Sequence, residues 1–287
     1  MTDITTVAVP FTGPFDVAAA LGNLRAHALP GAEVLHENSI TRIIAAPSGP
    51  VAVTVKLETD AITAKIATDR VADVDAVIGT IRRWLDLDLD PGDIHAALWR
   101  DPVVGPLVVE RPGLRVIGAV NGFETAVMSV LGQQVSLAAA RTFGGRLVSG
   151  FGAPGPAGLT LFPTAGALAT ETPDALRSAV GLTGARSSTL HALASECAAG
   201  LPLAPETDQA EFRARLIALP GIGPWTVDYL AVRVLGDRDA FTASDLVLRR
   251  ALGGVSVKTA EAASEAWRPF RAYALFHLWT SASYLPT

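Results

Sequence analysis

The 287-residue sequence contains one cysteine, no net positive charge and no long apolar run. The single cysteine, Cys197, excludes a disulfide framework within the chain and a cysteine-only zinc or iron–sulfur site. No stretch of about 18 apolar residues is present, so no membrane span is expected. The first residues have neither a basic region nor a long apolar run, so no signal peptide is expected either. We therefore expect a cytoplasmic protein.

The formal net charge is −5, whereas proteins that bind nucleic acid by charge alone are strongly basic overall. The sequence is therefore not typical of that class. It does not exclude local binding. The five histidines form no pair at metal-ligand spacing. The length is sufficient for two domains or one large one, with an ample core.

The first part of the chain has the pattern of a mixed α+β domain. Within 50–58, valines and Leu57 alternate with smaller or polar residues, which predicts a strand with one buried face. Two more strands are expected over 40–46 and 61–68, and helices over 15–28 and 72–86. The segment 88–93, "DLDPGD", interrupts this pattern. We predict an N-terminal domain over 1–115 with a small antiparallel sheet and helices.

From about residue 120 the pattern is helical, which predicts an all-α second domain over 116–287. Asn121 and Glu124 have the spacing of a capping box, and Ser136 begins the next helix. The proline-rich segment 151–164 is expected to be a loop. Further helices are predicted over 172–180, 185–200, 208–219, 225–236, 244–252, 258–270 and 271–282.

The stretch "LPGIGPWT", residues 219–226, predicts a tight hairpin in front of a helix. Gly221 and Gly223 permit positive φ and close backbone approach, and Pro224 suits a first helical turn. Backbone N–H groups and the helix dipole at such a place favour a phosphate without any lysine. The alternative is a plain glycine turn between packed helices.

A carboxylate follows this hairpin. Asp245 stands nineteen residues after Thr226, beside Ser244, at the predicted start of a helix. By itself this position is most simply an N-cap. Together with the hairpin, the sequence resembles the helix-hairpin-helix (HhH-GPD) DNA glycosylase superfamily, and within it the AlkA type of 3-methyladenine DNA glycosylase II. The resembling segments are "LPGIGPWTVDYLAVR", "FTASDLVLRRAL", "EAWRPFRAYALFHLW" and "NGFETAVMSVLGQQVSLAAA".

The resemblance implies a glycosylase core of two helical lobes in which Asp245 is the catalytic group. A fixed carboxylate stabilises the positive charge that develops on the sugar as an N-glycosidic bond breaks. It can also orient or deprotonate the attacking water. Asp228 is the competing carboxylate, and we expect it to face solvent or another helix.

The resemblance also implies an aromatic pocket for a base that has left the duplex. Trp225, Tyr229 and Trp279 match pocket aromatics of the family, and Leu246 stands where an aromatic residue would extend the stacking surface. Their aromatic faces would attract a positively charged alkylated purine. The alternative is that these rings are simply core. Asn23 falls near the position where the N-terminal domain of the family adds another aromatic residue to the pocket.

Trp225 occupies the position of the Schiff-base lysine of bifunctional relatives, which implies a monofunctional enzyme without lyase activity. No cofactor is required by the resemblance, and the iron–sulfur cluster of some relatives is not expected. A structural Na⁺ or K⁺ at the hairpin is implied by resemblance alone. Its ligands would be the backbone carbonyls of Ile217, Leu219 and Ile222.

The expected DNA contacts come from two loops. Gln133 and Gln134 lie in "LGQQVS", 131–136, with Gln134 at the position that fills the gap left by the flipped base. The alternative for Gln134 is an ordinary polar loop residue. The hairpin would contact the backbone through Gly221, Gly223 and Thr226.

These features predict a base-excision repair enzyme that releases alkylated purines such as 3-methyladenine or 7-methylguanine. The partner is double-stranded DNA with alkylated bases, and we expect a nucleoid-associated monomer. Two alternatives are a non-enzymatic helix-hairpin-helix DNA-binding module and a glycosylase for deaminated or oxidised bases. The chain can also belong to a longer polypeptide with an alkyl-transfer module.

Overall fold

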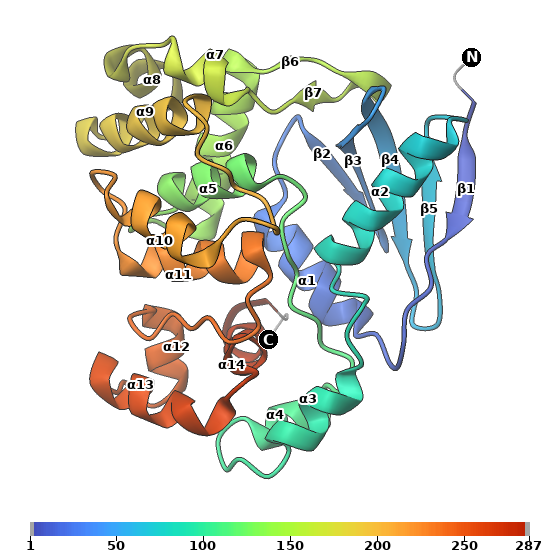
Figure 1. The fold of residues 1–287 in the computed structure, drawn as a ribbon, viewed down its shortest axis with the longest axis vertical. Helices are drawn as coiled ribbons and strands as arrows, with labels where there is room; N and C mark the ends of the chain where they lie inside the picture. Colours follow the sequence, from blue (N-terminus) through green and yellow to red (C-terminus); the bar gives the residue numbers. More distant parts are fainter. Residues whose placement is uncertain (1–2, 285–287) are drawn as a thin grey trace.

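An antiparallel sheet with two helices forms the N-terminal part of the chain (Figure 1). The computed structural model describes residues 3–284. The strand order is β1-β5-β4-β3-β2, with every neighbouring pair antiparallel. The strands are β1 (Thr5–Ala8), β2 (Glu33–His36), β3 (Ser39–Ala46), β4 (Gly49–Leu57) and β5 (Ile62–Ile66). The three strands predicted from the sequence are confirmed.

The outer strands β1 and β2 were not predicted. Each is four residues long, which is too short for an alternating pattern to stand out. In β4, Val53, Val55 and Leu57 are fully buried, as the alternation indicates. The helix α2 (Val71–Trp84) packs on β3, and Val77 and Ile81 are among its buried residues.

The helix α1 (Val17–His27) lies between the sheet and the helical part of the chain (Figure 1). Asp16 caps it by accepting the N–H of Ala19. Two helices were not predicted: α3 (Pro91–Leu98), which begins within the segment 88–93, and α4 (Gly105–Glu110). Asp90 caps α3, so the interruption in the pattern marks a helix start.

The rest of the chain is helical, apart from one short ribbon. Segment 151–164, expected as a loop, contains the paired strands β6 (Ala153–Pro154) and β7 (Thr160–Leu161). The helices are α5 (Gly122–Leu131), α6 (Leu137–Phe151), α7 (Ala165–Ala169), α8 (Pro173–Val180), α9 (Gly184–Ala198), α10 (Gln209–Ile217), α11 (Pro224–Leu230), α12 (Leu246–Ala251), α13 (Val257–Ser264) and α14 (Arg271–Trp279). The predicted helices are confirmed, and α7 was not predicted.

Two π-helical turns extend helices of this part. Ala231–Leu235 continues α11, and Thr280–Tyr284 continues α14. In Figure 1, α5 to α11 form one group of helices and α12 to α14 a second group below it. One cluster of buried apolar residues runs through the sheet, α5 and α14, so the two parts share a core. Within residues 3–284, the helices are too short or too polar to cross a membrane.

Candidate active site

Asp245 is held by three N–H donors at the start of α12. Its Oδ1 accepts the backbone N–H of Leu248 at 2.7 Å and the indole N–H of Trp279 at 3.0 Å. Its Oδ2 accepts the indole N–H of Trp225 at 2.9 Å. The residue is 8% exposed. Asp245 is therefore an N-cap, as the simpler interpretation predicts, and also a fixed carboxylate between two tryptophans from different helices.

The three predicted aromatic residues form one cluster, which we call the aromatic stack after its stacked pair, Trp225 and Tyr229. The rings of Trp225 and Tyr229 lie 5.2 Å apart and within 11° of parallel, because their i, i+4 spacing puts them on one helix face. Trp279 is tilted against Tyr229 at 6.2 Å. Phe276, one turn before Trp279, is 5.4 Å from it. All three predicted rings line the same cavity as Asp245.

This cavity has a volume of about 300 Å³, within the range of small-molecule sites. The helical part contributes Asp245 and the aromatic stack to its wall. The N-terminal part contributes Asn23 and His27 of α1, Glu33 of β2 and Arg42 of β3. The site is therefore built between the two parts of the chain.

A buried ion cluster joins the N-terminal wall to α5. The guanidinium of Arg42 bonds Glu33 at 2.5 Å and both carboxylate oxygens of Glu124 at 2.9 and 3.0 Å. It also lies 5.4 Å from the ring centre of Trp84. Burial raises the pKa of Glu33, and the charge of Arg42 opposes that rise.

Sequence reasoning missed this cluster because its members come from three distant segments. The one signal was the capping box of α5, and only half of that box forms. Asn121 accepts the N–H of Glu124 at 3.0 Å, but the Glu124 carboxylate turns to Arg42.

Three more cavity residues were not singled out as pocket residues from the sequence. Arg233 donates to the hydroxyl of Tyr229 at 3.1 Å, and its guanidinium lies 5.5 Å from that ring centre. The i, i+4 spacing of these two residues was an available signal. His27 packs edge-on against Tyr284 at 5.6 Å, and burial lowers the pKa of His27 to about 4, so the imidazole is neutral.

Leu246 does not lie in the base pocket as predicted. Its side chain is 54% exposed, and its neighbour Val247 lines the cavity instead. Successive helical residues are rotated by about 100°, so only one of the two faces the cavity once Asp245 is fixed as the cap. Asp228 lies away from the cavity, paired with Arg213 of α10 at 2.6 Å, as expected.

The hairpin between α10 and α11 needs glycine at its turn. Gly221 has φ +80, and a Cβ there would lie 2.0 Å from Oγ1 of Thr189. Gly223 precedes α11 with open space around its Cα. Thr226, predicted to contact DNA, is only 2% exposed because it belongs to the packed face of α11 with Val227. Its side chain is therefore not part of the surface.

The loop between α5 and α6 is tied to this hairpin through Gln133. The side-chain amide of Gln133 donates to the backbone carbonyl of Gly221 at 2.9 Å, and the backbone carbonyl of Gln133 accepts from the guanidinium of Arg186 at 2.5 Å. Gln134 next to it is exposed and has φ +56, a left-handed conformation unusual for glutamine. The two predicted DNA-contacting loops are thus held side by side.

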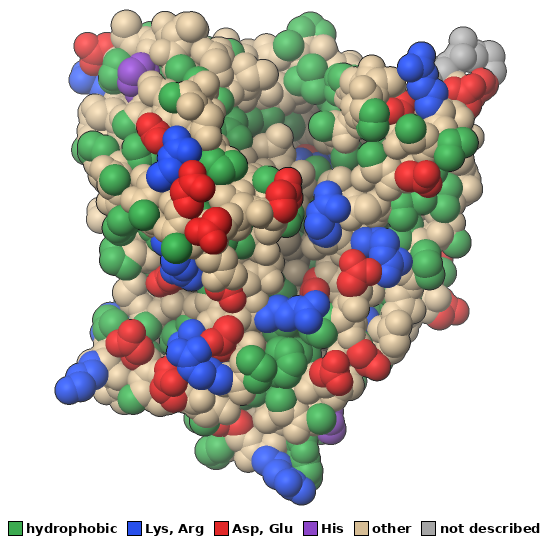
Figure 2. Space-filling model, viewed as in Figure 1, with side chains coloured by type: hydrophobic (Ala, Val, Ile, Leu, Met, Phe, Trp, Pro, Cys, Tyr) green, Lys and Arg blue, Asp and Glu red, His purple; other side chains and the backbone are tan. Residues whose placement is uncertain are grey.

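The remaining sequence expectations concern metals and charge. The carbonyl of Leu219 accepts the N–H of Ile222 at 3.1 Å, and Ile217 is the last residue of α10. The cation at these carbonyls stays a prediction. Residues 3–284 contain no cluster of three His, Cys, Asp or Glu side chains that would hold a metal ion. On the face in Figure 2, basic and acidic side chains are interspersed.

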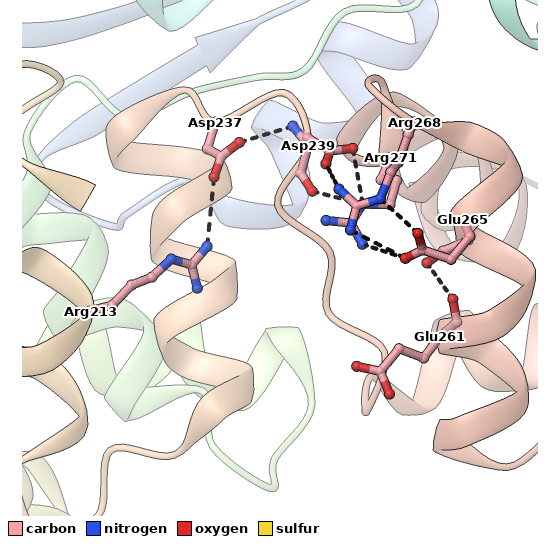
Figure 3. A network of polar contacts seen from close by, with 8 residues as sticks. Arg213, Asp237, Asp239, Glu261, Glu265, Arg268 and Arg271 are labelled. Carbon is pink, nitrogen blue, oxygen red and sulfur yellow. Dashed lines mark hydrogen bonds and ion pairs between the residues drawn. The ribbon is translucent and has the colours of Figure 1, made fainter. Parts of the chain in front are cut away.

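A network of ion pairs fixes the loop that leads to Asp245 (Figure 3). Arg271, the first residue of α14, bonds both the carbonyl and the carboxylate of Asp239 at 2.9 Å. Arg268 pairs with Asp239 and Glu265. Since α14 also carries Trp279, this network fixes the loop before Asp245 relative to the helix that provides one of its N–H donors.

The comparisons with known proteins agree with this architecture. Residues 6–121 match the family model of the AlkA N-terminal domain. Residues 127–269 match that of the HhH-GPD superfamily of base excision DNA repair proteins.

Two curated relatives and one solved structure are similar over most of the chain. A Mycobacterium tuberculosis protein named bifunctional transcriptional activator/DNA repair enzyme AlkA is 38% identical over 95% of this chain, which spans 56% of that relative. Escherichia coli DNA-3-methyladenine glycosylase 2 is 32% identical over 73% of each chain. The structure of 3-methyladenine DNA glycosylase from Archaeoglobus fulgidus covers 96% of this chain and 98% of its own, with a TM-score of 0.83 and 23% identity.

Proposed function

This chain belongs to the HhH-GPD superfamily of base excision DNA repair proteins, and we propose that it is a DNA glycosylase for alkylated purines. The proposed reaction hydrolyses the N-glycosidic bond of 3-methyladenine or 7-methylguanine in double-stranded DNA. The observation that carries it is the position of Asp245, fixed by two indole N–H groups in a cavity with stacked aromatic walls.

The side chains suit each step of that reaction. The extruded base stacks on Trp225, Tyr229 or Trp279, since aromatic faces attract a cationic purine. The bond from C1′ to the base breaks, its electron pair leaves with the base, and the positive charge of the alkylated base is neutralised. Asp245 stabilises the sugar cation that forms, and water adds to C1′ and gives one proton to the Asp245 carboxylate, which passes it to solvent. The products are a free base and an abasic site.

The charges around the cavity do not oppose a cationic base. Three carboxylates and three guanidiniums line it: Glu33, Glu124, Asp245, Arg42, Arg141 and Arg233. Selectivity for an alkylated base then rests on stacking and on hydrogen bonds rather than on net charge.

The enzyme is proposed to be monofunctional. A lyase needs an amine that attacks the sugar and forms a Schiff base. Among the described residues, no lysine lines the cavity, and Trp225 uses its N–H to hold Asp245. The DNA strand should therefore stay intact after the base is released.

DNA binding is proposed to use the paired loops. The backbone at Gly221 and Gly223 would contact phosphate, and Gln134 would fill the gap left by the base, with Gln133 holding the two loops together. A Na⁺ or K⁺ bound by the carbonyls of Ile217, Leu219 and Ile222 would support this contact. We propose that one monomer binds one damaged duplex.

The test uses duplex DNA that carries radiolabelled methyl groups. The wild-type protein should release 3-methyladenine or 7-methylguanine, identified by chromatography, and the strand should break only after treatment with alkali. Binding of the duplex without release of either base would contradict the proposal and favour a DNA-binding module. Strand breakage without alkali would contradict the monofunctional assignment.

A further inference from the structure

Asn23 of α1 carries a buried amide whose hydrogen-bonding groups are unused. The residue is 2% exposed and lines the cavity that holds Asp245. Neither Oδ1 nor Nδ2 has a hydrogen-bond partner among residues 3–284. A buried amide without partners costs folding free energy. Leucine has the same arrangement of heavy atoms and would avoid that cost, so the core alone does not explain an asparagine here.

Unpartnered polar atoms gather around this one cavity. In the described chain, eight buried side-chain atoms lack a partner, and four of them belong to residues of the cavity wall. These four are the two amide atoms of Asn23 and the Nε atoms of Arg42 and Arg233. Of the three residues that carry these four atoms, only Asn23 has both a donor and an acceptor free.

The packing of α1 fixes Asn23 in this wall. A Cβ at Gly22 would lie 2.3 Å from the carbonyl oxygen of Tyr284, so α1 and the turn after α14 are in close backbone contact. His27 bonds the carbonyl of Asn23 at 2.8 Å and packs its ring on Tyr284. The amide is thus presented beside the aromatic stack by a rigid element.

We infer that Asn23 determines specificity by hydrogen-bonding the N1 and C6 edge of the flipped-out purine. This inference rests on the proposed glycosylase function. Adenine has an N1 acceptor and an N6 donor on that edge, and guanine has an N1–H donor and an O6 acceptor. An amide matches either pair, since a rotation of 180° exchanges its donor and acceptor. Alkylation of adenine at N3 or guanine at N7 leaves this edge free.

The same geometry disfavours purines whose edge is blocked. In 1,N6-ethenoadenine an added ring blocks N1 and removes the N6–H donor, and such a base would leave the amide oxygen of Asn23 unpaired. A site that hydrogen-bonds its substrate rejects an analogue without the matching groups.

The test compares the wild type with Asn23→Leu on duplexes that contain 7-methylguanine or 1,N6-ethenoadenine. Single-turnover release of 7-methylguanine should fall at least about 10-fold in Asn23→Leu. The release rate of the etheno base should not fall. The ratio of the 7-methylguanine rate to the etheno-base rate should therefore decrease by the same factor of about 10. The melting temperature of the variant should be equal or higher, because an unpartnered amide has been removed. Thr172→Ala, which removes the N-cap of α8 outside the cavity, is the control: it should lower the melting temperature and leave the preference unchanged.

Each other outcome has a defined meaning. No base release by the wild type would contradict the proposed function itself. If the wild type releases 7-methylguanine and Asn23→Leu does so at a similar rate, the role of Asn23 is wrong. An equal fall on both bases together with a lower melting temperature would make Asn23 a structural residue, and would also overturn the inference.

Discussion

The two walls of the cavity differ in how their polar groups are satisfied. In the helical wall, the carboxylate of Asp245 accepts three N–H groups, two of them from aromatic side chains. In the N-terminal wall, Asn23 has no side-chain partner among the described residues, while Arg42 is bonded to two carboxylates. A group that stabilises a transition state must be fixed beforehand, whereas a group that recognises a base must be free to bond it.

The two walls are also expected to have different roles, one mainly in the stability of the fold and the other mainly in the reaction. The cluster of Arg42, Glu33 and Glu124 joins the sheet to α5 and therefore holds the two walls together. The tryptophan pair around Asp245 joins α11 to α14 through the reacting group itself. Changes in the first should alter unfolding most strongly, and changes in the second should alter base release.

The largest expected effect is on stability, from Arg42→Met. Removal of the guanidinium leaves the carboxylates of Glu33 and Glu124 unpaired, with side chains only 6% and 15% exposed, which costs about 3–5 kcal/mol in the free energy of unfolding. Urea denaturation measures this loss. The triple variant Glu33→Gln, Arg42→Met, Glu124→Gln removes all three charges and should recover most of it. A triple variant as unstable as Arg42→Met would show that packing of Arg42 on Trp84 matters more than charge.

The second prediction concerns His277, on the side of α14 near Asp16 and Arg111. Burial lowers the pKa of His277 to about 4, from 6.5 in an unfolded chain. Between these values only the unfolded chain takes up the proton. The contribution of His277 to the free energy of unfolding is therefore complete above pH 6.5. It falls by about 1.4 kcal/mol per pH unit as the pH decreases toward 4. Urea denaturation at pH 7, 6 and 5 gives the slope of the unfolding free energy against pH. In His277→Phe this slope should decrease by the equivalent of one proton. A slope equal to that of the wild type would contradict the prediction.

The third prediction tests the helical wall. Trp279→Phe keeps a ring in place but removes the N–H that Asp245 accepts, a bond to a charged group. Single-turnover release of 7-methylguanine should fall by about 10-fold or more. Trp84→Phe is the matched control, because Trp84 lines the same cavity on the N-terminal side and donates to no reacting group. Equal effects of the two variants would remove the distinction between the walls.

The smallest effect is expected from Gln134→Gly, in the loop between α5 and α6. Glycine tolerates the left-handed conformation at φ +56, so the variant should be more stable by up to about 1 kcal/mol. Loss of the side chain should weaken binding to damaged duplex several-fold, as measured by fluorescence anisotropy. Unchanged binding would mean that Gln134 is an ordinary loop residue.

The sequence allowed prediction of the helical wall better than of the N-terminal wall, for a physical reason. Asp245, Trp225 and Tyr229 lie in two recognisable motifs, a hairpin and a helix start, and the resemblance carried by these motifs implied their roles. Spacing alone placed only Trp225 and Tyr229 on one helix face. Arg42 and its carboxylates meet only through the packing of β2, β3 and α5, which no local pattern encodes.

The errors in the predicted site have the same origin. Leu246 was placed in the pocket by its neighbourhood to Asp245, but the helical rotation after the cap turns it outward. Thr226 was placed among the DNA contacts by its position in the hairpin. Its side chain lies on the packed face of α11, which leaves only its backbone for that contact, and the contact stays a prediction. Which side of a helix is buried depends on its partner elements, and the motif does not contain that information.

The most direct test of the account is the rate of 7-methylguanine release by Asp245→Asn under single-turnover conditions. Asparagine keeps the shape and can still cap α12, but it removes the negative charge from the cavity. We predict a fall of about 10²-fold or more, with binding of damaged duplex retained. A variant that releases the base at the wild-type rate would contradict the central claim that the Asp245 carboxylate stabilises the reacting sugar.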